Sequence, residues 1–314
     1  MPNRFIVCLR ARAQHPLESW RKWKYSNLAV SLAGYIVEEA SGMPFEEYIK
    51  ENILKPLEMD STYVESVPKD HPQFAKGYGR RMPDGTREIS PYTNSRGIIP
   101  AANMATTVID LAQFAMLQFR EDRDGPVLSG GTLREMHRVH WLDPNWELGW
   151  GIGFNIQRIN GKTYIGHGGS VPGYRTNIRI NLKEKVAVIV FINSGDGDPV
   201  KYVEKAHKWI APALADEEEG SLPEDWSRYT GRFRNRWGDS EILRYNGELI
   251  MINPQLPDPL EECTTLKHVE GDKFQMKAPG YGSHNEYAVY AFNEKGEIEW
   301  LKTGENYTYP VESW

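Results

Sequence analysis

Two short stretches of the sequence carry groups that could take part in catalysis. The first is Tyr25-Ser26-Asn27, which places a phenol, a hydroxyl and an amide side by side. The second is Gly166-His167-Gly168-Gly169-Ser170, which places an imidazole before two glycines. A phenol or an imidazole can move a proton. Glycines in a strand let a ligand approach the backbone, where the N–H of Ser170 would act as a donor. Each stretch also has a plain explanation, as a helix start or a glycine-rich turn.

An amphipathic helix is predicted directly after the first stretch, from Leu28 to Ser41. Ser26 or Asn27 can cap it, because a short side-chain oxygen accepts hydrogen bonds from the first free N–H groups. Gly42 supplies the left-handed stop. The apolar residues that recur at helical spacing are Leu28, Leu32, Ile36 and Ala40. This period predicts one buried face, with Tyr25 at the mouth of the helix.

The elements that follow predict a domain of helices and an antiparallel sheet. Helices are predicted at 45–54, 106–119, 132–140 and 199–214, and strands at 150–157, 162–165, 175–181 and 186–193. Thr107 with Asp110 and Thr132 with Glu135 are interpreted as helix caps. Asn160-Gly161 predicts a hairpin turn. The apolar run 186–191 is interpreted as a central strand that is buried on both faces.

Beyond residue 214 the pattern changes to short strands only. The acidic segment 215–225 is interpreted as a linker by its composition. Strands are predicted at 229–235, 241–245, 248–252, 264–268, 273–276, 286–292, 297–302 and 307–311. This spacing is typical of a small antiparallel barrel or sandwich. The predicted organisation is a poorly defined lead-in at 1–24, an α+β domain at 25–214, the linker at 215–225 and an all-β domain at 226–314.

Composition excludes several classes of function. The chain has 314 residues, a net charge of -6 and 10 Trp. The negative charge and the lack of a basic stripe argue against nucleic acid as a partner, and the aromatic content favours aromatic-lined clefts. No apolar run is long enough for a membrane helix, and no Cys/His cluster has zinc spacing. The run Phe5–Leu9 is too short for a signal-peptide core, so the compartment stays open.

Four blocks of sequence in a fixed order carry a family resemblance. They are Tyr25–Ala29, Ala40–Ile49 continued by Ile53–Met59, Pro100–Thr107 with Asp110–Ala112, and His167-Gly168-Gly169. The chain resembles the serine β-lactamase and penicillin-binding-protein-like hydrolases, a group that spans class C β-lactamases, D-aminopeptidases and related esterases. Tyr25-Ser26-Asn27 matches the family's Tyr-x-Asn motif, and His167 stands where many members have the lysine of Lys-Thr-Gly. The segment Tyr229–Phe233 and the strand rhythm resemble the lipocalin-like domain often appended to this group.

The resemblance implies roles for the candidate residues. Tyr25 would shuttle a proton, Asn27 would hold the substrate carbonyl or amide, and His167 would anchor the polar end of the substrate. Gly168, Gly169 and Ser170 would line the substrate and oxyanion site, with the Ser170 N–H as a donor. The implied reaction is hydrolysis of a small-molecule ester, peptide or β-lactam-like substrate through an acyl-serine. Neither a metal nor an organic cofactor is expected.

The family's nucleophile motif, Ser-x-x-Lys, has no counterpart at the expected place. It belongs several tens of residues before Tyr-x-Asn. Four letter matches are interpreted as coincidences: Ser19–Lys22, Ser66–Lys69, Lys302-Thr303-Gly304 and Tyr92-Thr93-Asn94. We therefore expect the chain to be N-terminally incomplete and inactive by itself. Two alternatives stay open. One is a non-catalytic binding or scaffold relative, and the other is a different nucleophile, for which Ser26, Ser95 and Ser170 are candidates by type only.

The same absence predicts self-association. In this family the nucleophile helix is central, and part of the sheet comes from the same region. A sheet that lacks these elements exposes a strand edge and apolar faces, which are aggregation hazards.

Overall fold

The computed structural model describes residues 23–65, 67, 71–212, 224–279 and 283–313. It divides into two compact units, Met1–Val203 and Glu204–Trp314, which are described separately below. Nearly all of the lead-in at 1–24, the match Ser19–Lys22 and residues 215–223 of the linker lie outside the described residues, and so does most of Ser66–Lys69.

The first unit begins with helices. They are α2 (Asn27–Ser41), α3 (Phe45–Ile49) with the π-helical turn η1 (Lys50–Leu54), the 3-10 turn η2 (Arg96–Ile98), α4 (Ile99–Ala102), α5 (Val108–Gln118) and α6 (Gly130–His137). The predicted ends of α2 are confirmed. Ser26 is the cap, since its Oγ accepts from the Ala29 N–H at 3.1 Å. Gly42 ends the helix with φ at 70°.

The predicted buried face of α2 is wrong. Ser31 and Gly34 are buried in the structure, whereas Leu28 and Ile36 are exposed, Ile36 by 64%. The reason is that α2 packs on α4 through its small residues. A Cβ added to Gly34 would lie 2.4 Å from the Cγ of Pro100, so only glycine permits this approach. Helical spacing therefore identified the apolar row correctly but not the side that meets a neighbour.

The other two predicted helix caps are Thr107 for α5 and Thr132 for α6, and only the first is confirmed. Thr107 caps α5 as expected, because its Oγ1 accepts from the Asp110 N–H at 3.1 Å. The predicted Thr132 cap is wrong. Helix α6 begins at Gly130, and the Oγ of Ser129 accepts from the Thr132 N–H at 3.1 Å. Ser129 is thus the cap, three residues earlier than the pattern indicated.

The sheet of the first unit has six strands in chain order. They are β1 (Trp141–Leu142), β2 (Leu148–Trp150), β3 (Asn155–Ile159), β4 (Lys162–Val171), β5 (Tyr174–Asn181) and β6 (Val186–Ile192), all antiparallel. The turn at Asn160-Gly161 is confirmed, and both residues have positive φ. The single strand predicted at 150–157 is wrong. The chain leaves the sheet after Trp150, and the Ile152 N–H donates to the carbonyl of Met136 at the end of α6.

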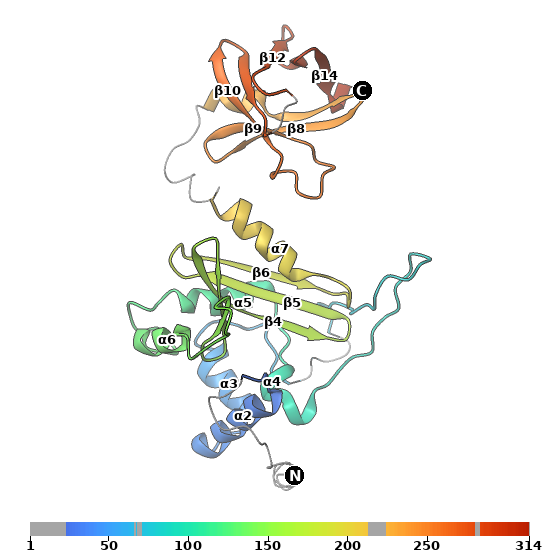
Figure 1. Cartoon of the computed structure of the whole chain (residues 1–314). Coiled ribbons are helices and arrows are strands. Elements are labelled where there is room, and N and C mark those ends of the chain that lie inside the picture. The colour runs from blue at the N-terminus through green and yellow to red at the C-terminus, as the bar shows by residue number, and fades with distance from the viewer. Residues whose placement is uncertain (1–22, 66, 68–70, 213–223, 280–282, 314) are drawn as a thin grey trace. The chain divides into compact units, whose positions relative to one another are not determined.

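Strand β6 lies at the edge of this sheet, so the prediction of a central strand is wrong. It pairs with β5 on one side, and no other described strand pairs with it. All seven of its residues are half-buried. Helix α5 packs behind the sheet (Figure 1), in a core that joins Ala115 to Ile165, Ile178 and Ile180. The apolar run 186–191 therefore reflects a strand whose two faces are both partly buried. It does not show that the strand lies in the middle of the sheet.

The predicted helix after the sheet starts as expected. It is α7 (Pro199–Lys205), which continues as the π-helical η3 (Ala206–Ile210). The apolar core under the first helices gathers Leu54, Leu57, Met59, Val64, Leu117 and Leu133.

The second unit is a closed eight-strand antiparallel barrel. After the 3-10 helix η4 (Glu224–Tyr229), the strands are β7 (Gly231–Asn235), β8 (Gly238–Tyr245), β9 (Glu248–Ile252), β10 (Thr264–Glu270), β11 (Lys273–Lys277), β12 (Tyr287–Phe292), β13 (Ile298–Thr303) and β14 (Asn306–Pro310), before the 3-10 turn η5 (Val311–Ser313). Neighbours in the chain are neighbours in the barrel, and β14 closes on β7. The predicted fold class, an α+β domain followed by a small antiparallel barrel, is confirmed.

Candidate active site

The two stretches that the sequence singled out meet in the first unit. The rings of Tyr25 and His167 lie 6.1 Å apart between centroids, although they come from opposite ends of the domain sequence. Trp150, at the end of β2, lies close to both of these rings and to Trp23. Its ring is 6.3 Å from Tyr25, 6.4 Å from His167 and 4.6 Å from Trp23, on which it stacks. The four rings form one cluster, which we call the aromatic cluster.

The Gly166–Ser170 stretch lies inside β4, so its interpretation as a turn between strands is wrong. Strand β3 pairs with β4 only as far as Gly166, whereas β5 pairs along the whole of β4. The edge of β4 from Gly168 to Val171 is therefore unpaired on the β3 side among the described residues. Gly168, Gly169 and Ser170 are all exposed. A strand edge of this kind offers backbone N–H and C=O groups to an extended ligand.

A close backbone approach explains one of these glycines. A Cβ added to Gly166 would lie 2.2 Å from the carbonyl oxygen of Ile178 on β5. At Gly169 an added Cβ would lie 2.4 Å from the Oγ1 of Thr176, a side chain that can rotate away. Gly166 is thus required by the sheet itself, and the glycines beyond it leave the strand edge uncovered.

The hydrogen bond of His167 fixes which ring nitrogen carries a proton. Its Nδ1 lies 2.7 Å from the carbonyl oxygen of Gly168. A carbonyl oxygen only accepts, so Nδ1 is the donor, and in the neutral ring Nε2 is an acceptor. At this position His167 offers an acceptor where a lysine would offer three donors.

The remaining candidate residues differ in their surroundings. Asn27 is the first residue of α2, and its side chain is exposed. The hydroxyl of Ser26 is engaged in capping α2. The hydroxyl of Ser95 donates to the carbonyl of Ala102. Ser170 is exposed on β4, opposite Arg175 of β5. Two of the three alternative serines therefore already have a structural hydrogen bond.

The two remaining letter matches lie in unrelated elements. Lys302-Thr303-Gly304 forms the turn between β13 and β14, where Gly304 has φ at 57°. Tyr92-Thr93-Asn94 precedes the short turn η2 and the four-residue α4. The expectation that no apolar helix follows this match needs a small correction, because Ile99–Ala102 is helical.

A hairpin from Gly77 to Ser90 lies next to the end of β4 and the start of β5. Tyr78 bridges to Ile89 within the hairpin and to Ser194 after β6. The hydroxyl of Tyr174 donates to the carbonyl of Ala75 at 2.7 Å. This hairpin is part of the loop-rich segment 58–105, and it forms a wall at the end of the strand pair.

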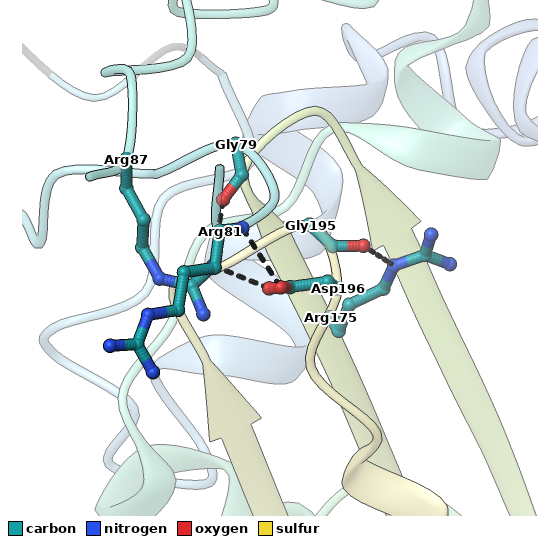
Figure 2. A network of polar contacts seen from close by, with 6 residues as sticks. All are labelled: Gly79, Arg81, Arg87, Arg175, Gly195 and Asp196. Carbon is teal, nitrogen blue, oxygen red and sulfur yellow. Dashed lines mark hydrogen bonds and ion pairs between the residues drawn. The ribbon is translucent and has the colours of Figure 1, made fainter. Parts of the chain in front are cut away.

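Asp196 fastens the hairpin, as Figure 2 shows. Its carboxylate accepts from the Arg87 side chain at 2.5 Å and from the Arg81 N–H at 3.0 Å. Arg87 also donates to the carbonyl of Gly79, and Arg175 donates to that of Gly195. The Arg87 hydrogen bond, followed by that of the Arg81 N–H, holds the pKa of the Asp196 carboxyl well below its usual range.

Sequence reasoning missed Trp23, Trp150 and Asp196. The high tryptophan content indicated an aromatic-lined cleft but not which rings form it. Asp196 follows a strand in a segment with no motif, so nothing local distinguishes it. Within the described residues, no group of three His, Cys, Asp or Glu side chains could hold a metal. None of the described helices is long and apolar enough to cross a membrane.

Comparison with known proteins agrees with this architecture. A family model described as Beta-lactamase matches residues 7–211. Beta-lactamase-like protein 2 of Dictyostelium discoideum is 26% identical over 66% of this chain and 38% of its own length. The octameric penicillin-binding protein homologue of Pyrococcus abyssi is 22% identical, with a TM-score of 0.58 over 98% of this chain and 69% of that one.

One similar structure contains a bound ligand. The D-amino acid amidase of Ochrobactrum anthropi SV3, complexed with L-phenylalanine amide, is 27% identical with a TM-score of 0.51. The match covers 61% of this chain and 59% of the amidase. The chain thus spans well under two thirds of the curated relative and of the amidase that it matches.

Proposed function

The chain belongs to the beta-lactamase family, and on that premise we propose that its first unit forms part of the cleft of a serine hydrolase. The reaction is hydrolysis of an ester or amide through an acyl-serine. The observation that carries the proposal is the aromatic cluster, which brings Tyr25 of the Tyr-x-Asn motif to within 6.1 Å of His167 on β4. Tyr25 therefore lies beside His167, one residue before the exposed stretch of the β4 edge.

Each residue has a role in this proposal. Tyr25 passes a proton between the nucleophile and the leaving group. The Ser170 N–H supplies one donor to the developing oxyanion, where loss of a donor typically costs about 10²–10³ in rate. Asn27 holds the amide or carbonyl of the substrate. His167 accepts a hydrogen bond through Nε2, which favours a substrate with an N–H or O–H group at that position.

Exposed apolar side chains on α2 and α5 support the proposal that a nucleophile helix packs on the first unit. Ile36 on α2 and Ile109 on α5 are 64% and 70% exposed, and Met116 on α5 is half exposed. Exposed apolar patches of this kind mark interaction surfaces. We propose that an apolar helix with the Ser-x-x-Lys motif covers them, and that the 314 residues without it do not turn over substrate. The amide bound by the amidase suggests amino acid amides as one substrate class.

The test compares the 314-residue chain with a longer chain that supplies a Ser-x-x-Lys helix before it. Both are assayed with p-nitrophenyl acetate, D-phenylalanine amide and a chromogenic cephalosporin. We expect turnover by the longer chain only, and a loss of about 10²–10⁴ in its kcat/KM on Tyr25→Phe. If neither chain turns over any substrate, the non-catalytic binding relative is favoured. Labelling of one serine in the 314-residue chain by a fluorophosphonate would contradict the proposal and favour a different nucleophile.

A further inference from the structure

The interior of the barrel is filled by its own side chains. Phe233, Phe274, Met276 and Leu301 are at most 1% exposed, and they pack together with Tyr229 and Tyr290. Small barrels of eight strands have just enough room for such a core. A ligand of this domain would therefore bind on the outer surface rather than in the lumen.

The outer surface carries three exposed rings at one end of the barrel. Trp237 lies in the β7–β8 turn, and Tyr307 and Tyr309 lie on β14, with 74%, 48% and 43% of their surface exposed. Thr308 between the two tyrosines is buried, so both rings point outward. Since β14 pairs with β7, the two hairpin ends are neighbours (Figure 1), and the rings border one shallow pocket of about 280 Å³.

Two of the three rings contact neighbouring side chains. The backbone N–H of Trp237 donates to the Oδ1 of Asn235 at 2.8 Å within the turn that carries the ring. The guanidinium of Arg236 lies 4.7 Å from the centre of the Trp237 ring. Trp300 meets Tyr307 edge-on, with 5.1 Å between centroids. Trp237 and Tyr307 therefore each have a neighbouring side chain against the ring at the edge of the pocket.

Hydrogen-bond donors and acceptors complete the pocket. Asn235, Arg236, Glu305 and Asn306 line it together with the three rings. Arg236 can only donate, Glu305 as a carboxylate can only accept, and Asn306 can do both. We call these seven residues the aromatic rim.

We propose that the aromatic rim binds an oligosaccharide. A sugar ring has a flat C–H face that packs on an aromatic ring, and its hydroxyls both donate and accept. This combination matches exposed rings bordered by a guanidinium, an amide and a carboxylate. An apolar ligand would desolvate these polar groups without replacing their hydrogen bonds, which is costly. A proline-rich peptide also docks on aromatic grooves. Its prolines offer only carbonyl acceptors, so they cannot donate to Glu305, which already pairs with Lys302 at 3.1 Å, or to the amide oxygen of Asn306.

The experiment titrates the full 314-residue chain with cellohexaose, chitohexaose and mannohexaose by isothermal titration calorimetry. We expect binding to at least one of them. Trp237→Ala should weaken that binding about fivefold, since one aromatic contact is worth about 1 kcal/mol. Tyr309→Ala should act in the same direction. Trp146→Ala removes a tryptophan of similar exposure in the other unit and should leave binding unchanged.

Three outcomes would overturn the proposal. The first is no binding of any of the three hexasaccharides at millimolar concentration. The second is binding that Trp237→Ala and Tyr309→Ala leave unchanged while both variants remain folded by circular dichroism. The third is binding of a decaproline peptide in place of the sugars. None of these results depends on whether the first unit has hydrolase activity.

Discussion

The two units of the molecule differ in how completely they close. In the barrel each strand has a neighbour on both sides, and the core residues are shielded by the chain itself. In the first unit, β6 has an unpaired edge among the described residues, and α2 and α5 expose apolar side chains. The candidate active site lies in this open unit, around the unpaired edge of β4. The barrel thus buries its core within its own strands, whereas the described part of the first unit leaves a strand edge and apolar side chains exposed.

The largest expected effect tests the self-sufficiency of the barrel. Phe274 is fully buried and makes edge contacts with Trp226, Tyr229 and Tyr290. Phe274→Ala leaves a cavity and should lower the free energy of unfolding of the barrel by about 3–5 kcal/mol. Urea unfolding followed by near-ultraviolet circular dichroism measures it.

Tyr287→Ala is the matched control for this variant. Tyr287 lies on the neighbouring strand β12, but its ring is half exposed. Its loss should change the free energy of unfolding by about 0.5 kcal/mol or less. Equal effects of the two substitutions would show that the barrel core does not hold the unit together.

The same comparison explains what the sequence could predict. All eight barrel strands were predicted, because a closed barrel has an inside and an outside, which the chain records as alternating polarity. The four-residue spacing in α2 was also correct, but the prediction that it is buried failed. Burial depends on a partner surface, and for Leu28 and Ile36 no such partner is among the described residues.

The candidate site shows the same limit. Tyr25 and His167 were predicted from motifs, since their chemistry is local to a few residues. Trp150 was missed because its place beside them depends on the break between β2 and β3, where the chain turns to the end of α6. The edge position of β6 was missed for a related reason. A run of apolar residues indicates that both faces of a strand are partly buried. It does not indicate how many strands pair with it.

The second prediction concerns association through the open unit. Ile109 is exposed on α5, so the chain should self-associate in a concentration-dependent way. Ile109→Lys should weaken the association on the order of tenfold, because burial of such a side chain is worth about 1.5–3 kcal/mol. Sedimentation velocity over a concentration series measures it. Val269→Lys, which changes an exposed residue of the barrel, is the control and should have no effect. A wild-type chain that stays monomeric throughout would contradict the expected self-association.

The third prediction concerns a polar contact that fastens α5 within the open unit. The carboxylate of Asp110 is buried, and it accepts from the Ser61 N–H at 2.8 Å and from the Thr62 hydroxyl at 2.7 Å. Asp110→Ala leaves these donors without a partner and should destabilise the first unit by about 1–3 kcal/mol. Thermal unfolding measures the loss. Asp110→Asn keeps one acceptor oxygen and should cost less. If the two variants are equally stable, the hydrogen bonds of the carboxylate do not fasten α5.

The smallest expected effect concerns the hairpin at the end of β4 and β5. The pKa of Asp196 is lowered by its hydrogen bond from Arg87 and then by that from the Arg81 N–H. A carboxyl whose pKa is lower in the folded state stabilises that state above the unfolded pKa, which is about 3.9 for Asp. The contribution is lost as the pH falls further toward the folded pKa. Asp196→Asn should therefore loosen the hairpin at neutral pH, with faster tryptic cleavage after Arg80 and Arg81.

The pH dependence separates this electrostatic effect from a packing effect. The difference in urea midpoint between wild type and Asp196→Asn should shrink as the pH falls from about 6 to about 3, because the Asp196 carboxyl then takes up a proton in the unfolded state while it stays ionised in the folded state. Asp60→Asn removes an exposed carboxylate outside the hairpin and should leave tryptic cleavage at Arg80 and Arg81 unchanged. A difference between Asp196→Asn and wild type that stays constant over this range would show that the charge of Asp196 does not hold the hairpin. The wall at the end of β4 would then depend on the backbone bridges of Tyr78 and on the hydrogen bond from Tyr174 to the carbonyl of Ala75.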